Sequence, residues 1–91
     1  MAAKVYVLEA ESPNCGGRIL RVYSNAMSAN MEAASLCNII RDDAVPVYGE
    51  NEPRLLTPAN WDTWDTVLEL LQECYGARDC YVEVTRLEVR P

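Results

Sequence analysis

The sequence of 91 residues contains no histidine and no phenylalanine. Histidine is the most frequent general base at neutral pH and the commonest metal ligand, so its absence argues against acid–base catalysis and against a histidine-containing zinc site. Without phenylalanine, a core must be built from Val, Leu, Ile, Tyr, Trp and Met. Hydrophobic residues still make up 49% of the chain, which is typical of a globular protein. We expect a single domain, residues 1–91, with one modest core.

Long apolar runs are also missing. No segment approaches the ~18 apolar residues needed to cross a bilayer, and the N-terminal residues do not form the apolar part of a signal peptide, so we expect a cytoplasmic protein. Basic residues are scarce, with 8 Lys and Arg against 14 Asp and Glu and a formal net charge of −6. This excess of acids disfavours direct binding to nucleic acid or to an anionic membrane. It favours a partner with a basic surface.

The four cysteines form no Cys-x-x-Cys pair; they are Cys15, Cys37, Cys74 and Cys80. In a reducing cytosol, this spacing favours thiols over a disulfide framework. A zinc site without histidine would need all four thiolates, so we predict no metal and no cofactor, with a redox or zinc protein kept as the least favoured hypothesis. Cys37 and Cys74 fall where predicted helices face the core and are expected to be small buried hydrophobes. Cys15, in a predicted turn, is the candidate exposed thiol.

The first half of the chain predicts a β-hairpin and a helix. Lys4–Ala10 and Arg18–Tyr23 are rich in β-branched and aromatic residues and are separated by turn formers, as in a hairpin with a longer loop. Both faces of the first strand are apolar, which suits a central strand. Ser24 or Asn25 can cap a helix that runs to about Arg41.

The second half predicts a short edge strand and a second helix. Pro46 cannot donate a ladder hydrogen bond, so any strand over Ala44–Tyr48 should be short and at an edge. Thr57 followed by proline is a helix start signal, with Asn60 as an alternative cap one turn later. This helix is expected to end near Tyr75.

The last predicted strand, Cys80–Val89, changes phase along its length. Val82 and Val84 share one face. Leu87 and Val89 fall on the opposite face, which predicts either a bulge or a change in what covers the sheet. The order β-β-α-(β)-α-β predicts an α+β fold, with two helices packed on one face of a small, mainly antiparallel sheet.

The helix predicted over Thr57–Tyr75 contains no Lys or Arg. Its tryptophans, Trp61 and Trp64, lie on an apolar stripe that continues through Leu68 and Leu71. We therefore expect both rings to pack in the core rather than to stack on bases.

Four acids line a second face of the same helix: Asp62, Asp65, Glu69 and Glu73. The helix dipole accounts for Asp62 near the N-terminus, but an acid at Glu73, near the C-terminal end, is mildly destabilising. The carboxylates would repeat at about 5–6 Å, comparable to phosphates along a DNA strand. We interpret them as a partner-binding face, and four further acids extend it: Asp42, Asp43, Glu50 and Glu52. The alternative is an ordinary solvated helix face, neutralised by Arg54 or Arg78.

The first predicted helix has a charge-poor face: Met27, Asn30, Met31, Ala34, Ser35 and Asn38. Adaptable and small side chains suit protein contact. A homodimer or larger homo-oligomer that assembles through this face, as a structural or adaptor module, is therefore an alternative function. A following loop that simply covers the helix explains the composition equally well.

Recognised signatures of catalysis are absent. The paired carboxylates on an exposed helix face lack a pocket that would separate their pKa values, and the sequence contains no phosphate-binding Gly-x-x-x-x-Gly-Lys and no Gly-x-Ser-x-Gly. We expect no catalytic residue. Arginines and glutamates alternate on the predicted strands and should form cross-strand ion pairs: Arg18, Arg21, Arg86 and Arg90 with Glu9, Glu83 and Glu88.

In size, acidity and the order hairpin, helix, helix, strand, the chain resembles the small acidic anti-defence proteins of phages and other mobile elements, the anti-CRISPR proteins especially. The resemblance implies a non-enzymatic inhibitor that binds a basic surface of a host protein or nucleoprotein complex and blocks access of nucleic acid.

Overall fold

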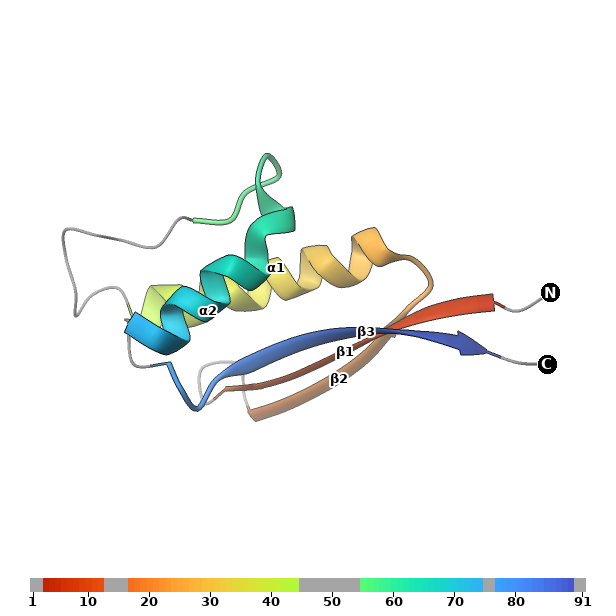
Figure 1. Ribbon diagram of the computed structural model, residues 1–91, viewed down its shortest axis with the longest axis horizontal. Helices are drawn as coiled ribbons and strands as arrows, with labels where there is room; N and C mark the ends of the chain where they lie inside the picture. The colour runs from red at the N-terminus through yellow and green to blue at the C-terminus, as the bar shows by residue number, and fades with distance from the viewer. Residues whose placement is uncertain (1–2, 13–16, 45–54, 75–76, 90–91) are drawn as a thin grey trace.

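The computed structural model describes residues 3–12, 17–44, 55–74 and 77–89, apart from the side chains of residues 3, 43, 44 and 74. Its elements follow the order β-β-α-α-β, with a short 3-10 helix, η3, ahead of the second helix (Figure 1). Their bounds are β1 Ala3–Ser12, β2 Gly17–Tyr23, α1 Ala26–Ala44, η3 Trp61–Thr63, α2 Trp64–Cys74 and β3 Tyr81–Val89. The predicted α+β class is confirmed. Of the predicted edge strand, Ala44 is the last residue of α1, and residues 45–48 lie outside the described residues.

The three strands form an antiparallel sheet in the order β2-β1-β3. The central position of β1 agrees with its two apolar faces. Leu8 of β1 stands opposite Arg21 of β2 and Val84 of β3. Because successive side chains alternate between faces, this register assigns every strand residue either to the face that the helices cover or to the opposite, open face.

The pairing of β1 with β3 is continuous from Ala3 with Val89 to Glu11 with Tyr81, so the predicted bulge is wrong. The other half of that prediction, a change in what covers the sheet, is confirmed. Val82 is buried under the helix layer, whereas Leu87 is 49% exposed on the open face. Figure 1 shows the reason, since β1 and β3 continue past the first turn of α1.

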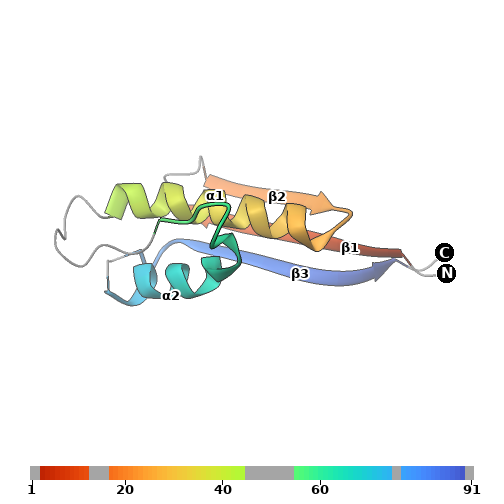
Figure 2. The ribbon, with the colours of Figure 1, turned by 90° about the horizontal axis from the view of Figure 1, so that it is seen from above.

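Both helices lie on the same side of the sheet, with α1 over β1 and β2 and α2 beside β3 (Figure 2). The layers meet at Leu8, Ile40 and Leu71, whose side chains are fully buried. The small residues Ala33 and Cys37 on the inner face of α1 are also fully buried, and their size lets that helix approach the sheet closely.

The two helix starts differ in how well the sequence predicts them. The side chain of Asn25 accepts the Ser28 N–H at 2.8 Å, so α1 has the expected cap, and it runs three residues past the predicted end at Arg41. Thr57 does not begin a helix, because residues 58–60 form a turn in which the Asn60 side chain accepts the Thr57 N–H at 2.6 Å. The helical segment begins after Asn60, the alternative start.

Candidate partner-binding surface

The four acids expected to form a partner-binding face are all exposed: Asp62, Asp65, Glu69 and Glu73. We call them the acidic row. Asp62 lies in η3 and the other three lie on α2. The carboxylate of Asp65 accepts the Thr66 N–H at 2.9 Å, a local contact at the start of α2 that leaves its charge uncompensated.

No cation neutralises the acidic row within the described part of the chain. The three ion pairs there join other residues, and Arg78 is exposed and pairs with neither Glu69 nor Glu73. Arg54, the other base considered, lies outside the described residues. Like charges three or four positions apart on a helix destabilise it by about 0.2–0.5 kcal/mol per pair. The chain therefore retains a repulsive arrangement that folding alone does not need.

The helix that carries the row is fixed on two sides. Trp64 donates its indole N–H to Asn30 Oδ1 of α1 at 2.8 Å, and Gln72 donates to the carbonyl of Cys80, just before β3, at 2.7 Å. Leu68 and Leu71 are buried beneath the helix. Trp61 and Trp64 are partly buried and pack against the core, which confirms that the aromatic stripe is structural.

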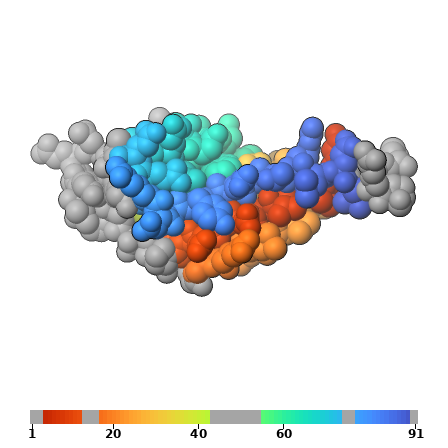
Figure 3. All heavy atoms as spheres, turned by 60° about the horizontal axis from the view of Figure 1, so that its bottom comes forward, coloured from red at the N-terminus to blue at the C-terminus, as the bar shows by residue number. Residues whose placement is uncertain are grey.

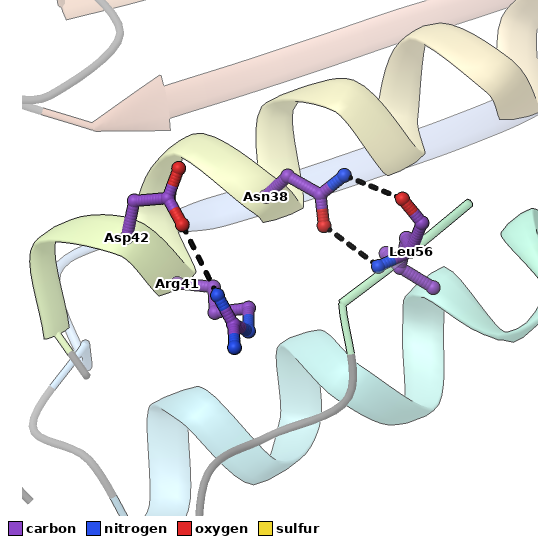
Figure 4. Close-up of polar contacts among 4 residues, drawn as sticks. All are labelled: Asn38, Arg41, Asp42 and Leu56. Carbon is purple, nitrogen blue, oxygen red and sulfur yellow. Dashed lines mark hydrogen bonds and ion pairs between the residues drawn. The ribbon is translucent and has the colours of Figure 1, made fainter. Parts of the chain in front are cut away.

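The four acids expected to extend the row are described only in part. Asp42 is exposed at the end of α1, where its carboxylate accepts from Arg41 Nη1 at 3.1 Å (Figure 4). Figures 1 and 2 place the C-terminal ends of α1 and α2 at the same end of the molecule, so Asp42 lies at the Glu73 end of the row. The remaining three lie outside the description, by side chain or entirely: Asp43, Glu50 and Glu52.

The charge-poor face of α1 is divided between internal contacts and solvent. Ala34 is buried, Asn30 accepts from Trp64, and Asn38 bonds the backbone of Leu56 (Figure 4). Over this part the segment that begins at Leu55 covers the helix, and a small cleft of about 150 Å³ remains between Met31 and Pro58. Of the six residues, Met27, Met31 and Ser35 are exposed.

The interpretation of the strand arginines is partly correct. Arg18 of β2 pairs with Glu9 of β1 as expected, and the hydrogen bond and charge of Glu9 raise the pKa of this guanidinium. Arg21 instead reaches across the layers and pairs with Glu32 of α1 at 2.8 Å. This ion pair is a strand-to-helix contact, because Arg21 lies on the face of β2 that the helices cover. Arg86 is exposed, and Arg90 lies outside the described residues.

Sequence reasoning missed a second surface, the open face of the sheet. Aliphatic side chains gather there from all three strands: Val5, Val7, Leu20, Val22, Leu87 and Val89. Figure 3 shows β2, β1 and β3 side by side on this side of the molecule, with no helix over them. The two apolar faces of β1 and the phase change of β3 are the available signals, but the first is interpreted as a central strand and the second as either a bulge or a change in what covers the sheet, without a separate apolar surface.

The cysteines that can be placed are structural. Cys37 and Cys80 are buried thiols, and Cys80 donates to Ser12 Oγ at 3.2 Å. The prediction of burial is confirmed for Cys37, while Cys15 and the side chain of Cys74 lie outside the description. Among the described residues, no three His, Cys, Asp or Glu side chains gather as a metal site would require. None of the described helices is both long enough and apolar enough to span a membrane.

Comparison with protein families, curated proteins and solved structures found no match to this chain.

Proposed function

We propose that the protein is a non-enzymatic inhibitor that uses the acidic row to bind a basic, nucleic-acid-binding surface of another protein. The proposed target is a host defence complex in the cytosol, blocked by a phage or mobile-element protein in the manner of anti-CRISPR proteins. The single observation that carries the proposal is the set of four exposed carboxylates on one helical segment without a described counter-ion.

The geometry of the row suits this role. From Asp62 to Glu73 the row spans about 16 Å at the helical rise of about 1.5 Å per residue, so it can contact several basic side chains at once. The contacts of Trp64 and Gln72 hold its helix before binding, which lowers the entropy lost on association. Charge complementarity of this kind acts mainly on the association rate and on specificity.

The experiment begins with capture of a protein from a nuclease-treated lysate of the host cell, followed by its identification and purification. The association rate with the purified partner is then measured over a range of salt concentrations. Reversing two charges of the row, Asp65→Lys with Glu69→Lys, should slow association at least tenfold at low salt and flatten its salt dependence. A nucleic acid that the partner binds should compete with the wild-type chain.

A matched control has the same net charge but leaves the row intact. Glu11 and Glu88 are exposed on strands, on opposite faces of the sheet, and Glu11→Lys with Glu88→Lys changes the formal charge from −6 to −2 as the row variant does. The control should keep at least most of the wild-type association rate. Unchanged affinity of the row variant, or equal loss in both variants, would refute a role for the row.

The alternative function is a homo-oligomer formed through the charge-poor face of α1. Only part of that face is free to contact another molecule. Three of the six residues of that face are engaged within the chain: Asn30, Ala34 and Asn38. Met27 and Met31 remain as its exposed apolar contacts.

A further inference from the structure

The open face of the sheet exposes more aliphatic surface than a solvated sheet face needs. Leu20 and Val22 of β2 are 64% and 63% exposed, and Leu87 and Val89 of β3 are 49% and 46% exposed. Together with two valines of β1 they form the aliphatic patch. Antiparallel sheets with one solvated face normally carry polar residues there, and apolar patches that gather in this way mark contact surfaces.

Charge on this face lies at one end of the aliphatic patch. Glu9 of β1 and Glu83 of β3 stand directly opposite each other, and like charges in this position destabilise a sheet. Glu9 pairs with Arg18, whereas Glu83 is exposed and has no ion pair among the described residues. The face therefore combines an aliphatic patch with an acidic end that an external cation would stabilise.

We propose that this face binds an amphipathic helix of another protein, which lays aliphatic side chains on the patch and Lys or Arg side chains over Glu83 and Glu9. The charges complement each other, and the bound base offsets the repulsion between the two glutamates. The acidic row lies in the helix layer, on the other side of the sheet (Figure 2). This interface is therefore separate from the acidic row and does not rest on the proposed function.

The backbone of the sheet favours a helix as the occupant. From Tyr6 to Glu11, β1 pairs with both neighbouring strands, so the middle of the face offers side chains and no unpaired backbone group. A helix bonds its own N–H and C=O groups internally. An extended segment laid across the face would leave these groups unpaired.

The dimensions of the face match a single helix. From Val89 to Glu83, β3 is about 20 Å long at about 3.3–3.4 Å per residue, the length of about 13 helical residues at about 1.5 Å each. The outer strands β2 and β3 lie about 10 Å apart, close to the helix diameter of about 10–12 Å. Such a patch is smaller than the ~800 Å² that each partner gives to a standard interface. We expect a dissociation constant of about 10 µM to 1 mM.

A second copy of this chain lacks the complementarity that the helix has. A two-fold axis across the strands at Val7 would set Glu9 against Val5 of the second copy. An axis along β1 would set Glu9 against its own counterpart and Glu83 against Leu20. Either arrangement buries a carboxylate against an aliphatic side chain or another carboxylate, which is costly.

The test is an NMR titration of the full chain, with labelled Val and Leu methyl groups, against a synthetic stapled helix of about 14 residues. This peptide carries a leucine stripe and has lysines in its last turn. The methyl signals of Leu20, Val22 and Leu87 should shift, while those of Leu8 and Val82, buried on the helix-covered face, should shift less. A second peptide of the same composition and charge, without the stripe, should bind about tenfold more weakly or worse.

One pair of matched variants tests the aliphatic patch. Leu20→Lys with Val22→Lys should weaken binding of the striped peptide by about tenfold or more, and lysine is well tolerated on an edge strand such as β2. Met27→Lys with Met31→Lys makes the same charge change at exposed side chains of α1 and should bind as the wild type does. The methyl shifts of the wild type need no variant.

A second pair tests the acidic end. Glu83→Lys should weaken binding by about threefold or more at low salt, because it removes the acid without a described counter-ion. Glu88→Lys makes the same charge change on the same strand, but Glu88 stands opposite Lys4, on the other face of the sheet. This control should lose less affinity than Glu83→Lys.

The variant of the acidic row, Asp65→Lys with Glu69→Lys, removes the proposed function and should keep the methyl shifts of the open face. Absence of these shifts in the wild type at about 1 mM peptide, equal binding of the two peptides, or equal loss in Glu83→Lys and Glu88→Lys would overturn the proposal. Loss of the shifts in the row variant alone would also overturn it and would assign the peptide to the acidic row. Methyl shifts that depend on protein concentration without peptide would assign the face to a second copy instead.

Discussion

The side-chain amide of Asn38 binds the backbone of Leu56 at both of its polar groups. Asn38 Nδ2 donates to the Leu56 carbonyl at 2.8 Å, and Asn38 Oδ1 accepts the Leu56 N–H at 2.9 Å (Figure 4). The amide thus pairs with the chain as a neighbouring strand would, eighteen residues further along the sequence. This contact holds the segment that leads into η3 against α1, and Leu56 is buried beside it.

Replacing Asn38 by alanine should destabilise the fold by about 1–3 kcal/mol, because a partly buried N–H and carbonyl of Leu56 lose their partner. The measurement is urea denaturation followed by circular dichroism. Ser35→Ala is the matched control, since the Ser35 hydroxyl is exposed and bonds only the Met31 carbonyl of its own helix, at 3.2 Å. A loss no larger for Asn38→Ala than for Ser35→Ala would contradict the role assigned to the amide pair.

Asn38 also illustrates what the sequence could not predict. The charge-poor composition of α1 was compatible with a contact surface for a partner and with cover by the following loop. For Asn38, the position of Leu56 distinguishes these two possibilities. That position depends on a contact between residues eighteen positions apart in the sequence. Thr57 is a different case, because its local start signal is overridden by another local contact: the Asn60 side chain accepts the Thr57 N–H at 2.6 Å.

Where periodicity and burial agree, the sequence alone predicts where an element lies and which of its sides is buried. The apolar faces of β1 predicted its central place, and the stripe through Leu68 and Leu71 predicted which side of α2 is buried. The acidic row follows from the same periodicity, because residues that do not face the core must face solvent. Whether Arg78 folds back onto Glu73 is a question of tertiary contact, which helical spacing does not encode.

Two neighbouring leucines of α2 should differ sharply in their effect on stability. Leu71 is fully buried, whereas Leu70 is 40% exposed. Leu71→Ala should cost about 2–5 kcal/mol, since it removes buried methyl groups and leaves a cavity. Leu70→Ala changes the same atoms in the same helix and should cost less than about 1 kcal/mol.

Chemical denaturation of both variants gives the comparison directly. Similar losses at the two positions would mean that α2 is rotated from the orientation that buries Leu71 and exposes Leu70. The acidic row would then no longer face solvent, so this pair of variants also tests the basis of the proposed function.

The bond between Trp64 and Asn30 should contribute measurably to the packing of the two helices. Trp64→Phe removes the indole N–H and leaves Asn30 Oδ1 without that donor, at an expected cost of about 1–3 kcal/mol including the lost ring volume. A double-mutant cycle with Asn30→Ala separates the two effects, and the coupling should be about 0.5–1.5 kcal/mol.

Trp61→Phe combined with Asn30→Ala is the reference cycle. Trp61 packs against the same core, but the hydrogen bond to Asn30 comes from Trp64. We expect a smaller coupling there. Equal coupling in the two cycles would show that the Trp64 hydrogen bond is not the source of the interaction.

The buried thiols should be protected from alkylation in the folded protein. Cys37 and Cys80 are buried to 0% and 6% exposure, and Cys80 donates to Ser12 Oγ inside the core. A reagent such as iodoacetamide attacks the exposed thiolate, so both residues should react only when the structure opens. A short pulse of reagent, followed by peptide mass spectrometry, should leave both unmodified in buffer and fully modified in concentrated urea. Rapid labelling of Cys80 in buffer would contradict the burial of Cys80 against Ser12. It would also call into question the contact by which Gln72 of α2 binds the Cys80 carbonyl.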